Sequence, residues 1–127
     1  MNKTSKGFLG ENLAITYLLQ NQYAIIVRNY RKKWGEIDIV ADDKKTKETV
    51  FVEVKTISLK ENSSPPVLPE EELTEEKIKR LKRVILSFLS QYHLEDKPWR
   101  FDFIAIEIQN DALKPEIRHY KDVYLEF

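Results

Sequence analysis

The sequence predicts an α/β domain of three layers, in which a mixed central sheet carries one helix on each face. The main observation is the order of the predicted elements, which is helix, three strands, helix, strand. Short connections between the three successive strands favour an antiparallel meander, whereas a long helix before the fourth strand favours a parallel, right-handed crossover. The second observation is size and composition: 127 residues, 42% of them apolar, suffice for one packed domain over residues 1–127.

The first element is a helix over about residues 5–20. Gly7 and Gly10 weaken its first turns, because glycine costs about 1 kcal/mol relative to alanine in a helix. Glu11 borders the apolar face, so its side chain emerges either at the edge of the helix or toward a site on the sheet, and taken alone it favours the edge. The apolar side chains recur at helical spacing and comprise Phe8, Leu9, Ala14, Ile15, Leu18 and Leu19.

Three strands follow, over residues 23–29, 34–41 and 49–56. The first of these is rich in β-branched and aromatic residues, which favour strands. The polar stretch 42–48 separates the second strand from the third and predicts a turn. These two strands are therefore expected to form a hairpin.

The second half of the chain predicts one long helix and two further strands. Residues 62–69 are dominated by proline and serine, so no regular structure is expected there. Thr74 has the features of a helix N-cap, and two glutamates follow it in the first turn, where the helix dipole favours acids. This helix continues to about residue 92, and the strands are expected over residues 100–108 and, at shorter length, 116–120.

The composition excludes several classes of site and location. The chain has no cysteine, which rules out disulfides, thiolate zinc sites and cysteine nucleophiles and favours a reducing compartment. Residues 1–6 do not resemble a signal peptide, and no apolar run reaches membrane-spanning length, so the cytoplasm is the expected location. The formal net charge of zero argues against bulk electrostatic coating of nucleic acid, although basic clusters at 28–33 and 77–83 flank an acidic segment, 61–76.

Two motifs place charged side chains where a sheet covered on both faces should be apolar. In residues 50–55, the valines share one face of the strand, while Glu53 and Lys55 share the other at a separation of about 7 Å. In residues 35–40, Asp38 points away from the isoleucines on either side of it. If the two strands pair as a hairpin, two carboxylates and a lysine converge on one patch of the sheet.

Such a constellation suits the hydrolysis of a phosphodiester. Carboxylates bind hard divalent cations through oxygen, and the cation polarises the phosphoryl oxygen and makes a water more acidic. A lysine beside the cation can orient that water or stabilise the charge of the transition state. The residues alone favour a simpler alternative, which is a cross-strand salt bridge of Lys55 with Asp38 or Glu53.

The order of several motifs along nearly the whole chain is more specific than any one of them. The motifs are Gly7-x-x-Gly10-Glu11-x-x-Ala14-x-x-Tyr17-Leu18, Arg28-Asn29-Tyr30-Arg31, Gly35-Glu36-Ile37-Asp38-Ile39-Val40, Val50-Phe51-Val52-Glu53-Val54-Lys55-Thr56, Lys77, Arg100-Phe101-Asp102 and Ile117-x-His119. Together they resemble the PD-(D/E)XK nuclease superfamily. More closely, they resemble the YraN-like family of predicted endonucleases akin to archaeal Holliday-junction resolvases.

This resemblance implies a restriction-endonuclease-like fold and an endonuclease that cuts DNA, including branched or recombining DNA, with Mg²⁺ as cofactor and Mn²⁺ as a substitute. Asp38 and Glu53 would be metal ligands and Lys55 the catalytic lysine. Glu11 would complete the catalytic site as a further metal ligand, and Lys77 would lie near the phosphates of the nucleic acid. Resolvase-like members often act as dimers, so a homodimer is also implied.

For the other charged residues, the sequence allows either nucleic-acid binding or simple exposure to solvent. Arg28 and Arg31 precede the strand of Asp38 and are the better candidates for nucleic-acid binding, whereas most basic residues of the second helix are expected to solvate its outer face. Two departures from the family pattern are Ile57, in place of an arginine, and the acidic run 70–72. That acidic segment either folds away from the substrate groove or weakens the binding of nucleic acid.

Three functions therefore remain open at the level of the sequence. The first is a metal-dependent nuclease, and the second is a non-catalytic nucleic-acid-binding or interaction module that kept the nuclease fold. The third makes the charged strand residues a structural ion-pair network. His93 and His119 lack metal-ligand spacing and are assigned no catalytic role, with His119 expected to be structural.

Overall fold

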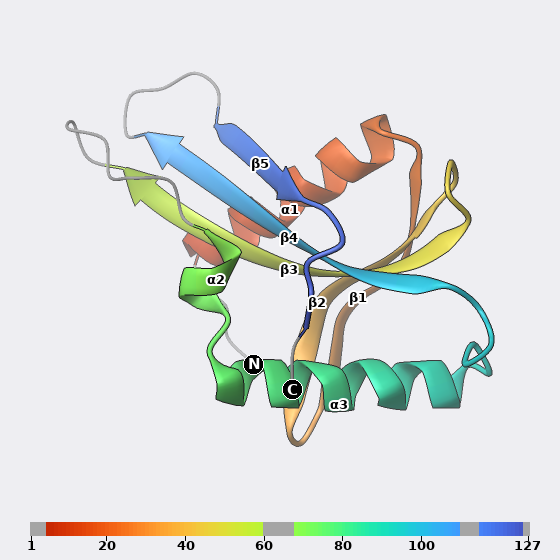
Figure 1. Ribbon diagram of the computed structural model, residues 1–127. Coiled ribbons are helices and arrows are strands. Elements are labelled where there is room, and N and C mark those ends of the chain that lie inside the picture. Colours follow the sequence, from red (N-terminus) through yellow and green to blue (C-terminus); the bar gives the residue numbers. More distant parts are fainter. Residues whose placement is uncertain (1–4, 60–67, 110–114, 126–127) are drawn as a thin grey trace.

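The computed structural model describes residues 5–59, 68–109 and 115–125. A helix, three strands, two helices and two strands follow one another along the chain (Figure 1). The elements are α1 (Ser5–Gln20), β1 (Tyr23–Lys32), β2 (Gly35–Asp43), β3 (Glu48–Leu59), α2 (Pro69–Glu72), α3 (Glu75–Gln91), β4 (Trp99–Gln109) and β5 (Glu116–Tyr120). The predicted order is confirmed with one addition, the short helix α2. Its first residue, Pro69, belongs to the segment 62–69, in which no regular structure was expected, and residues 62–67 of that segment lie outside the described residues.

The five strands form one mixed sheet in the order β1-β2-β3-β4-β5. The first three strands form an antiparallel meander, in which Arg28 lies opposite Ile39 and Ile39 lies opposite Val52. The strands β3 and β4 are parallel, with Val52 opposite Asp102, because α2 and α3 provide the crossover between them. Strand β5 then pairs antiparallel with β4. The predicted meander and parallel crossover are both confirmed.

The two longer helices cover opposite faces of this sheet (Figure 1). Neighbouring side chains of a strand point to opposite faces, so Val40 and Phe51 pack in the cluster under α3, whereas Ile39, Val50 and Val52 pack in the cluster under α1. Burial of each such side chain contributes about 1.5–3 kcal/mol to folding. The three-layer α/β/α architecture expected from the sequence is thereby confirmed.

Local contacts explain where both long helices lie. The Thr74 hydroxyl accepts a hydrogen bond from the backbone N of Lys77 at 3.2 Å, which confirms the predicted N-cap of α3. In α1, a Cβ atom added to Gly10 would overlap the Thr56 hydroxyl on β3. The glycine that weakens the helix therefore permits its close approach to the sheet. Within the described ranges, no helix is long and apolar enough to cross a membrane.

Candidate active site

Asp38 lies where β2 and β3 separate. The paired residues of this hairpin end at Ile39 and Val52, one position before Asp38 and Glu53 would face each other. Beyond that point the Asp38 side chain replaces the backbone as acceptor, because its Oδ2 accepts a hydrogen bond from the backbone N of Val54 at 2.8 Å. Asp38 is only 6% exposed. The end of the hairpin thus holds a buried carboxylate in a defined orientation.

Asp38 and Glu53 contribute to one open pocket of about 170 Å³ on the face of the sheet that α3 covers. The pocket is lined by Gly35, Glu36, Asp38, Glu53, Lys77, Arg80 and Leu81. A single water needs only roughly 10–15 Å³, so this pocket can admit a hydrated cation or a phosphate group. The structure therefore brings together Asp38, Glu53 and Lys77 of the residues predicted from the sequence.

Lys55 lies two residues beyond Glu53 on β3 but is not among the residues that line the pocket. Its Nζ pairs instead with Glu72 Oε1 of α2, at 3.2 Å. Pro69 and Leu73 are both buried and anchor this short acidic helix against the domain. The acidic run 70–72, one of the two departures from the family pattern, is thus folded next to the predicted catalytic lysine through Glu72.

Glu11 is almost completely buried, at 3% exposed, but it belongs to the helix on the opposite face of the sheet. Its Oε1 lies 3.9 Å from a terminal guanidinium nitrogen of Arg28 on β1. The same Arg28 nitrogen donates a hydrogen bond to Asn12 Oδ1 at 2.9 Å, and the guanidinium carbon lies 5.9 Å from the centre of the Phe8 ring. Glu11 and Arg28 therefore form a contact between α1 and β1, and Glu11 does not line the pocket of Asp38.

Arg31, the other arginine predicted to bind nucleic acid, lies near the end of β1. A terminal nitrogen of its guanidinium lies 3.4 Å from Glu36 Oε2 on β2. Because Glu36 also lines the pocket, this ion pair places Arg31 at the margin of the same region. Both arginines are about two-fifths exposed, which leaves part of each guanidinium accessible to a ligand.

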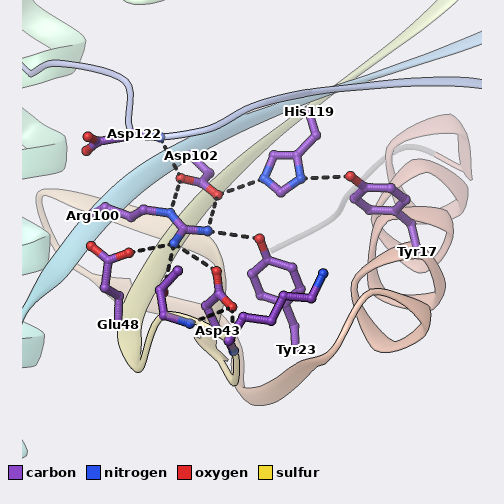
Figure 2. A network of polar contacts seen from close by, with 10 residues as sticks. Tyr17, Tyr23, Asp43, Glu48, Arg100, Asp102, His119 and Asp122 are labelled. Carbon is purple, nitrogen blue, oxygen red and sulfur yellow. Dashed lines mark hydrogen bonds and ion pairs between the residues drawn. The ribbon is translucent and has the colours of Figure 1, made fainter.

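A larger polar network is centred on Arg100, on the face of the sheet covered by α1 (Figure 2). Arg100 Nη1 lies 2.9 Å from Asp43 Oδ2 and 2.8 Å from Glu48 Oε1, and its Nε donates to Asp102 Oδ1 at 3.0 Å. Its Nη2 donates to the Tyr23 hydroxyl at 2.9 Å. One buried guanidinium thus links β1, β2, β3 and β4, and the role of Arg100 is structural.

The network continues from Asp102 to α1. His119 Nε2 lies 2.7 Å from Asp102 Oδ2, and His119 Nδ1 lies 2.9 Å from the Tyr17 hydroxyl (Figure 2). Asp102 also accepts a hydrogen bond from the backbone N of Asp122 at 2.9 Å. His119 therefore ties β5 to β4 and α1, which agrees with the structural role expected for it.

The electrostatics of this network favour the charged acids and the neutral tyrosine. Burial raises the pKa of Asp102, but hydrogen bonds from His119 and Arg100 outweigh this effect and bring the pKa below its usual value; Asp43 behaves likewise through Arg100. Both acids bind fewer protons when folded, so their stabilisation is present at neutral pH and is lost as the pH falls below the ordinary aspartate pKa of about 3.9. Burial raises the pKa of Tyr23 to about 12.

The raised pKa of Tyr23 predicts an alkaline loss of stability. The folded protein keeps the Tyr23 proton above the ordinary tyrosine pKa of about 10, so the stabilisation is complete below that pH and is lost as the pH rises toward about 12. One proton changes the free energy of unfolding by about 1.4 kcal/mol per pH unit. Urea titrations of wild type and Tyr23→Phe should show their stability difference narrowing by about 1 kcal/mol between about pH 10 and about pH 11. A constant difference would contradict this role for Tyr23.

The donor set of the pocket fits a magnesium ion that keeps part of its water shell. Magnesium is bound in proteins through one or two carboxylates together with waters and substrate phosphates. Asp38 and Glu53 supply two such carboxylates within one pocket. Among the residues that the structure describes, no cluster of three or more acidic or histidine side chains could enclose a metal ion by itself. Water and substrate oxygens would therefore have to complete the coordination.

Two charged residues of this region were missed at the level of the sequence. Arg80 lines the pocket, although the basic residues of this helix were mostly expected to solvate its outer face. A usable signal was present, because Arg80 follows Lys77 by three residues and so shares its side of the helix. Glu72 was noted only as part of an acidic run, and its pairing with Lys55 had no signal in the local sequence.

Fold and pocket together define an α/β/α domain with an open carboxylate pocket between the sheet and one covering helix. The chain belongs to the uncharacterised protein family UPF0102, whose family model matches residues 10–106, and this confirms the YraN-like resemblance. A UPF0102 protein of Geotalea uraniireducens is 43% identical over 120 residues, which cover 94% of this chain and 89% of that protein. A UPF0102 protein of Caldicellulosiruptor bescii is 38% identical over 125 residues, covering 98% of this chain and 100% of the relative.

Among solved structures, the chain is similar to a crystal structure of a repair endonuclease from Pyrococcus abyssi. The similarity has a TM-score of 0.45 and 14% sequence identity, and it covers 87% of this chain and 41% of that one.

Proposed function

We propose that this protein is a metal-dependent endonuclease that hydrolyses DNA phosphodiester bonds in the cytoplasm, with Mg²⁺ as its cofactor and Mn²⁺ as a substitute. The observation that carries the proposal is the shared pocket of Asp38 and Glu53, with Lys77 on the opposite wall. Carboxylates that would hold a cation thus face a basic group that would attract a phosphate. The restriction-endonuclease-like motifs support the same chemistry, and they suggest branched DNA as a substrate and a homodimer as the active form.

Each residue of the pocket has a defined task in this proposal. Asp38 and Glu53 would hold the cation, which when bound would polarise the phosphoryl oxygen and make a water more acidic. Hydrolysis joins the water oxygen to phosphorus and breaks one phosphorus–oxygen ester bond, and the leaving alcohol takes up a proton. The chain must therefore orient a water, and Lys55, two residues beyond Glu53 on the same strand, is the residue proposed for that task.

A cleavage assay tests the proposal. Linear, nicked and four-way DNA are incubated with the protein in Mg²⁺ or Mn²⁺, and wild type is compared with Glu53→Gln. Metal-dependent cleavage by wild type that Glu53→Gln abolishes would support the proposal. If wild type cuts none of these substrates and neither Asp38→Asn nor Glu53→Gln changes metal binding, the proposal fails.

The alternative is a binding module that kept the nuclease fold without catalysis. The pairing of Lys55 with Glu72, outside the pocket, favours this alternative, since the lysine then serves as a structural contact. Such a module would bind DNA in a salt-sensitive way, would lose that binding when Arg28 and Arg31 are changed, and would not cleave at any metal concentration.

The ion pair of Lys55 also makes a prediction about rate. Both side chains are partly exposed, at 49% and 26%, and such pairs are worth up to about 1 kcal/mol. If Lys55 leaves Glu72 to act in hydrolysis, Glu72→Gln should raise the single-turnover rate by up to about fivefold. Glu70→Gln, on the exposed side of the same short helix, is the matched control and should leave the rate unchanged. Equal rates for the two variants would show that Glu72 does not restrain the lysine.

A further inference from the structure

The basic residues of α3 divide into groups with different surroundings. Lys77 and Arg80 line the pocket together with Leu81. Their spacing of three and four residues puts them on one side of the helix. Arg83 instead lies over the Trp34 ring, with its guanidinium carbon 4.1 Å from the ring centre. Lys79 is exposed and does not line the pocket. Only part of this basic helix therefore faces the carboxylates.

Close packing between α3 and the start of β2 fixes the position of Arg80. A Cβ atom added to Gly35 would lie 3.1 Å from Val84 Cγ2 and 3.7 Å from Arg80 Cβ. The first residue of β2 thus lies close to the base of the Arg80 side chain, where a larger residue would meet Arg80 and the buried Val84. The Arg80 side chain therefore begins at a closely packed point of the pocket wall.

The two basic side chains of the pocket, Lys77 and Arg80, are not paired with acidic groups of the described residues. Glu36 already pairs with Arg31, and Lys77 enters the N-cap only through its backbone N. In the part of the chain that the structure describes, the side chains of Lys77 and Arg80 form no salt bridge or hydrogen bond. Lys77 and Arg80 thus line the same pocket as Asp38 and Glu53, and neither basic side chain has an anionic partner among the described residues.

We propose that Arg80 is a phosphate-binding residue of this site, which holds a phosphate of the DNA substrate together with Lys77. The inference rests on the proposed function, because the carboxylates are taken to hold a cation on the other wall of the pocket. A phosphate has enough oxygens to contact the cation on one wall and the basic side chains on the other at the same time. The guanidinium suits this task, since its planar fork can donate two parallel hydrogen bonds to a phosphate.

The test measures DNA binding separately from cleavage. A fluorescent duplex oligonucleotide is titrated with protein in EDTA, and fluorescence anisotropy gives the Kd. Arg80→Gln should weaken binding about tenfold, because a hydrogen bond to a charged group is lost. It should also reduce the slope of log K against log salt by about 1. Lys79→Gln, with the same charge change outside the pocket, should alter Kd less than about twofold. Arg80→Lys keeps the charge but not the fork and should fall between wild type and Arg80→Gln.

The outcomes separate this inference from the proposed function. If Arg80→Gln behaves like Lys79→Gln while wild type binds and cuts DNA, the role of Arg80 is wrong and the nuclease proposal stands. If Arg80→Gln loses binding but wild type never cuts DNA with metal, the phosphate site stands and the nuclease proposal fails. If wild type does not bind the duplex at all, the phosphate site is overturned, and the cleavage assay on linear, nicked and four-way DNA decides the nuclease proposal. Arg80 is exposed, and thermal unfolding of each variant checks that the fold is retained.

Discussion

Replacing Asp38 with asparagine is expected to abolish metal binding and to reduce metal-dependent cleavage by roughly 100-fold or more. A bound cation contributes several kcal/mol to the stabilisation of the transition state, and each 1.4 kcal/mol is worth a factor of about ten in rate. The substitution removes the negative charge but keeps an oxygen that can accept the hydrogen bond from the backbone N of Val54. The fold should therefore survive, and titration with Mn²⁺ by calorimetry measures the lost affinity.

The matched control for this variant is Asp42→Asn. Asp42 lies on the same strand but is exposed and does not line the carboxylate pocket. Its replacement makes the same change in charge and should leave both metal affinity and cleavage within about twofold of wild type, since exposed charges interact weakly. Equal metal affinity of Asp38→Asn and Asp42→Asn would contradict the assignment of Asp38 as a metal ligand.

Replacing Arg100 with alanine is expected to destabilise the domain by about 3–5 kcal/mol, because it leaves buried carboxylates without their partner. Asp102 is completely buried and Asp43 is 4% exposed, and Arg100 contacts both of them. A domain of this kind is stable by only about 5–15 kcal/mol, so the loss is a large share of the total. Urea unfolding at neutral pH measures it.

Arg31→Ala provides the comparison for Arg100→Ala. Arg31 also pairs with a carboxylate, but its side chain is 39% exposed and the pair with Glu36 spans 3.4 Å. Solvent screening limits such a pair to about 1 kcal/mol or less. If the two alanine variants differ by less than about 1 kcal/mol in their free energy of unfolding, the central role of the Arg100 network is wrong.

Local periodicity was sufficient to predict the long elements of the fold. The bounds of α1 and β5 agree with the structure, and Thr74 marks the start of α3, because apolar spacing and capping act within a few residues. The strand β1 extends three residues past its predicted end, since Lys32 still pairs with Gly35 across the turn. The short helix α2 was not predicted, because four residues are too few to show an apolar period, although Pro69 and the acidic residues after it are helix-start signals.

The candidate site was predictable only where residues on adjacent strands create it. Alternation along β3 places Glu53 on the same face as Phe51, as predicted. The alternation predicted for β2 is wrong, because Ile37 packs under α3 and Ile39 under α1, and Asp38 reaches the pocket of Glu53 where the hairpin pairing ends. The partner of Lys55 comes from a separate helix, seventeen residues later, and Arg100 collects partners from four strands. Except for Asp102, which follows Arg100 by two residues and so shares its face of β4, these contacts depend on tertiary packing and have no signal in residue spacing.

The position of Glu11 shows a further limit of motif order. The resemblance groups it with Asp38 and Glu53, whereas in the structure it is paired with Arg28 on the α1 face. An ordered set of motifs identifies which residues occur together in a family. It does not determine which side of a two-faced sheet each residue serves, and the role of Glu11 as a metal ligand stays a prediction.

Asp38 and Glu53 are proposed to hold a divalent cation together. Diffraction from crystals soaked in Mn²⁺ tests it most directly, because anomalous scattering locates the ion without reference to activity. An anomalous peak is expected in the pocket, within coordination distance of both carboxylates. A pocket without such a peak at saturating Mn²⁺, or a peak bound only elsewhere on the domain, would contradict it.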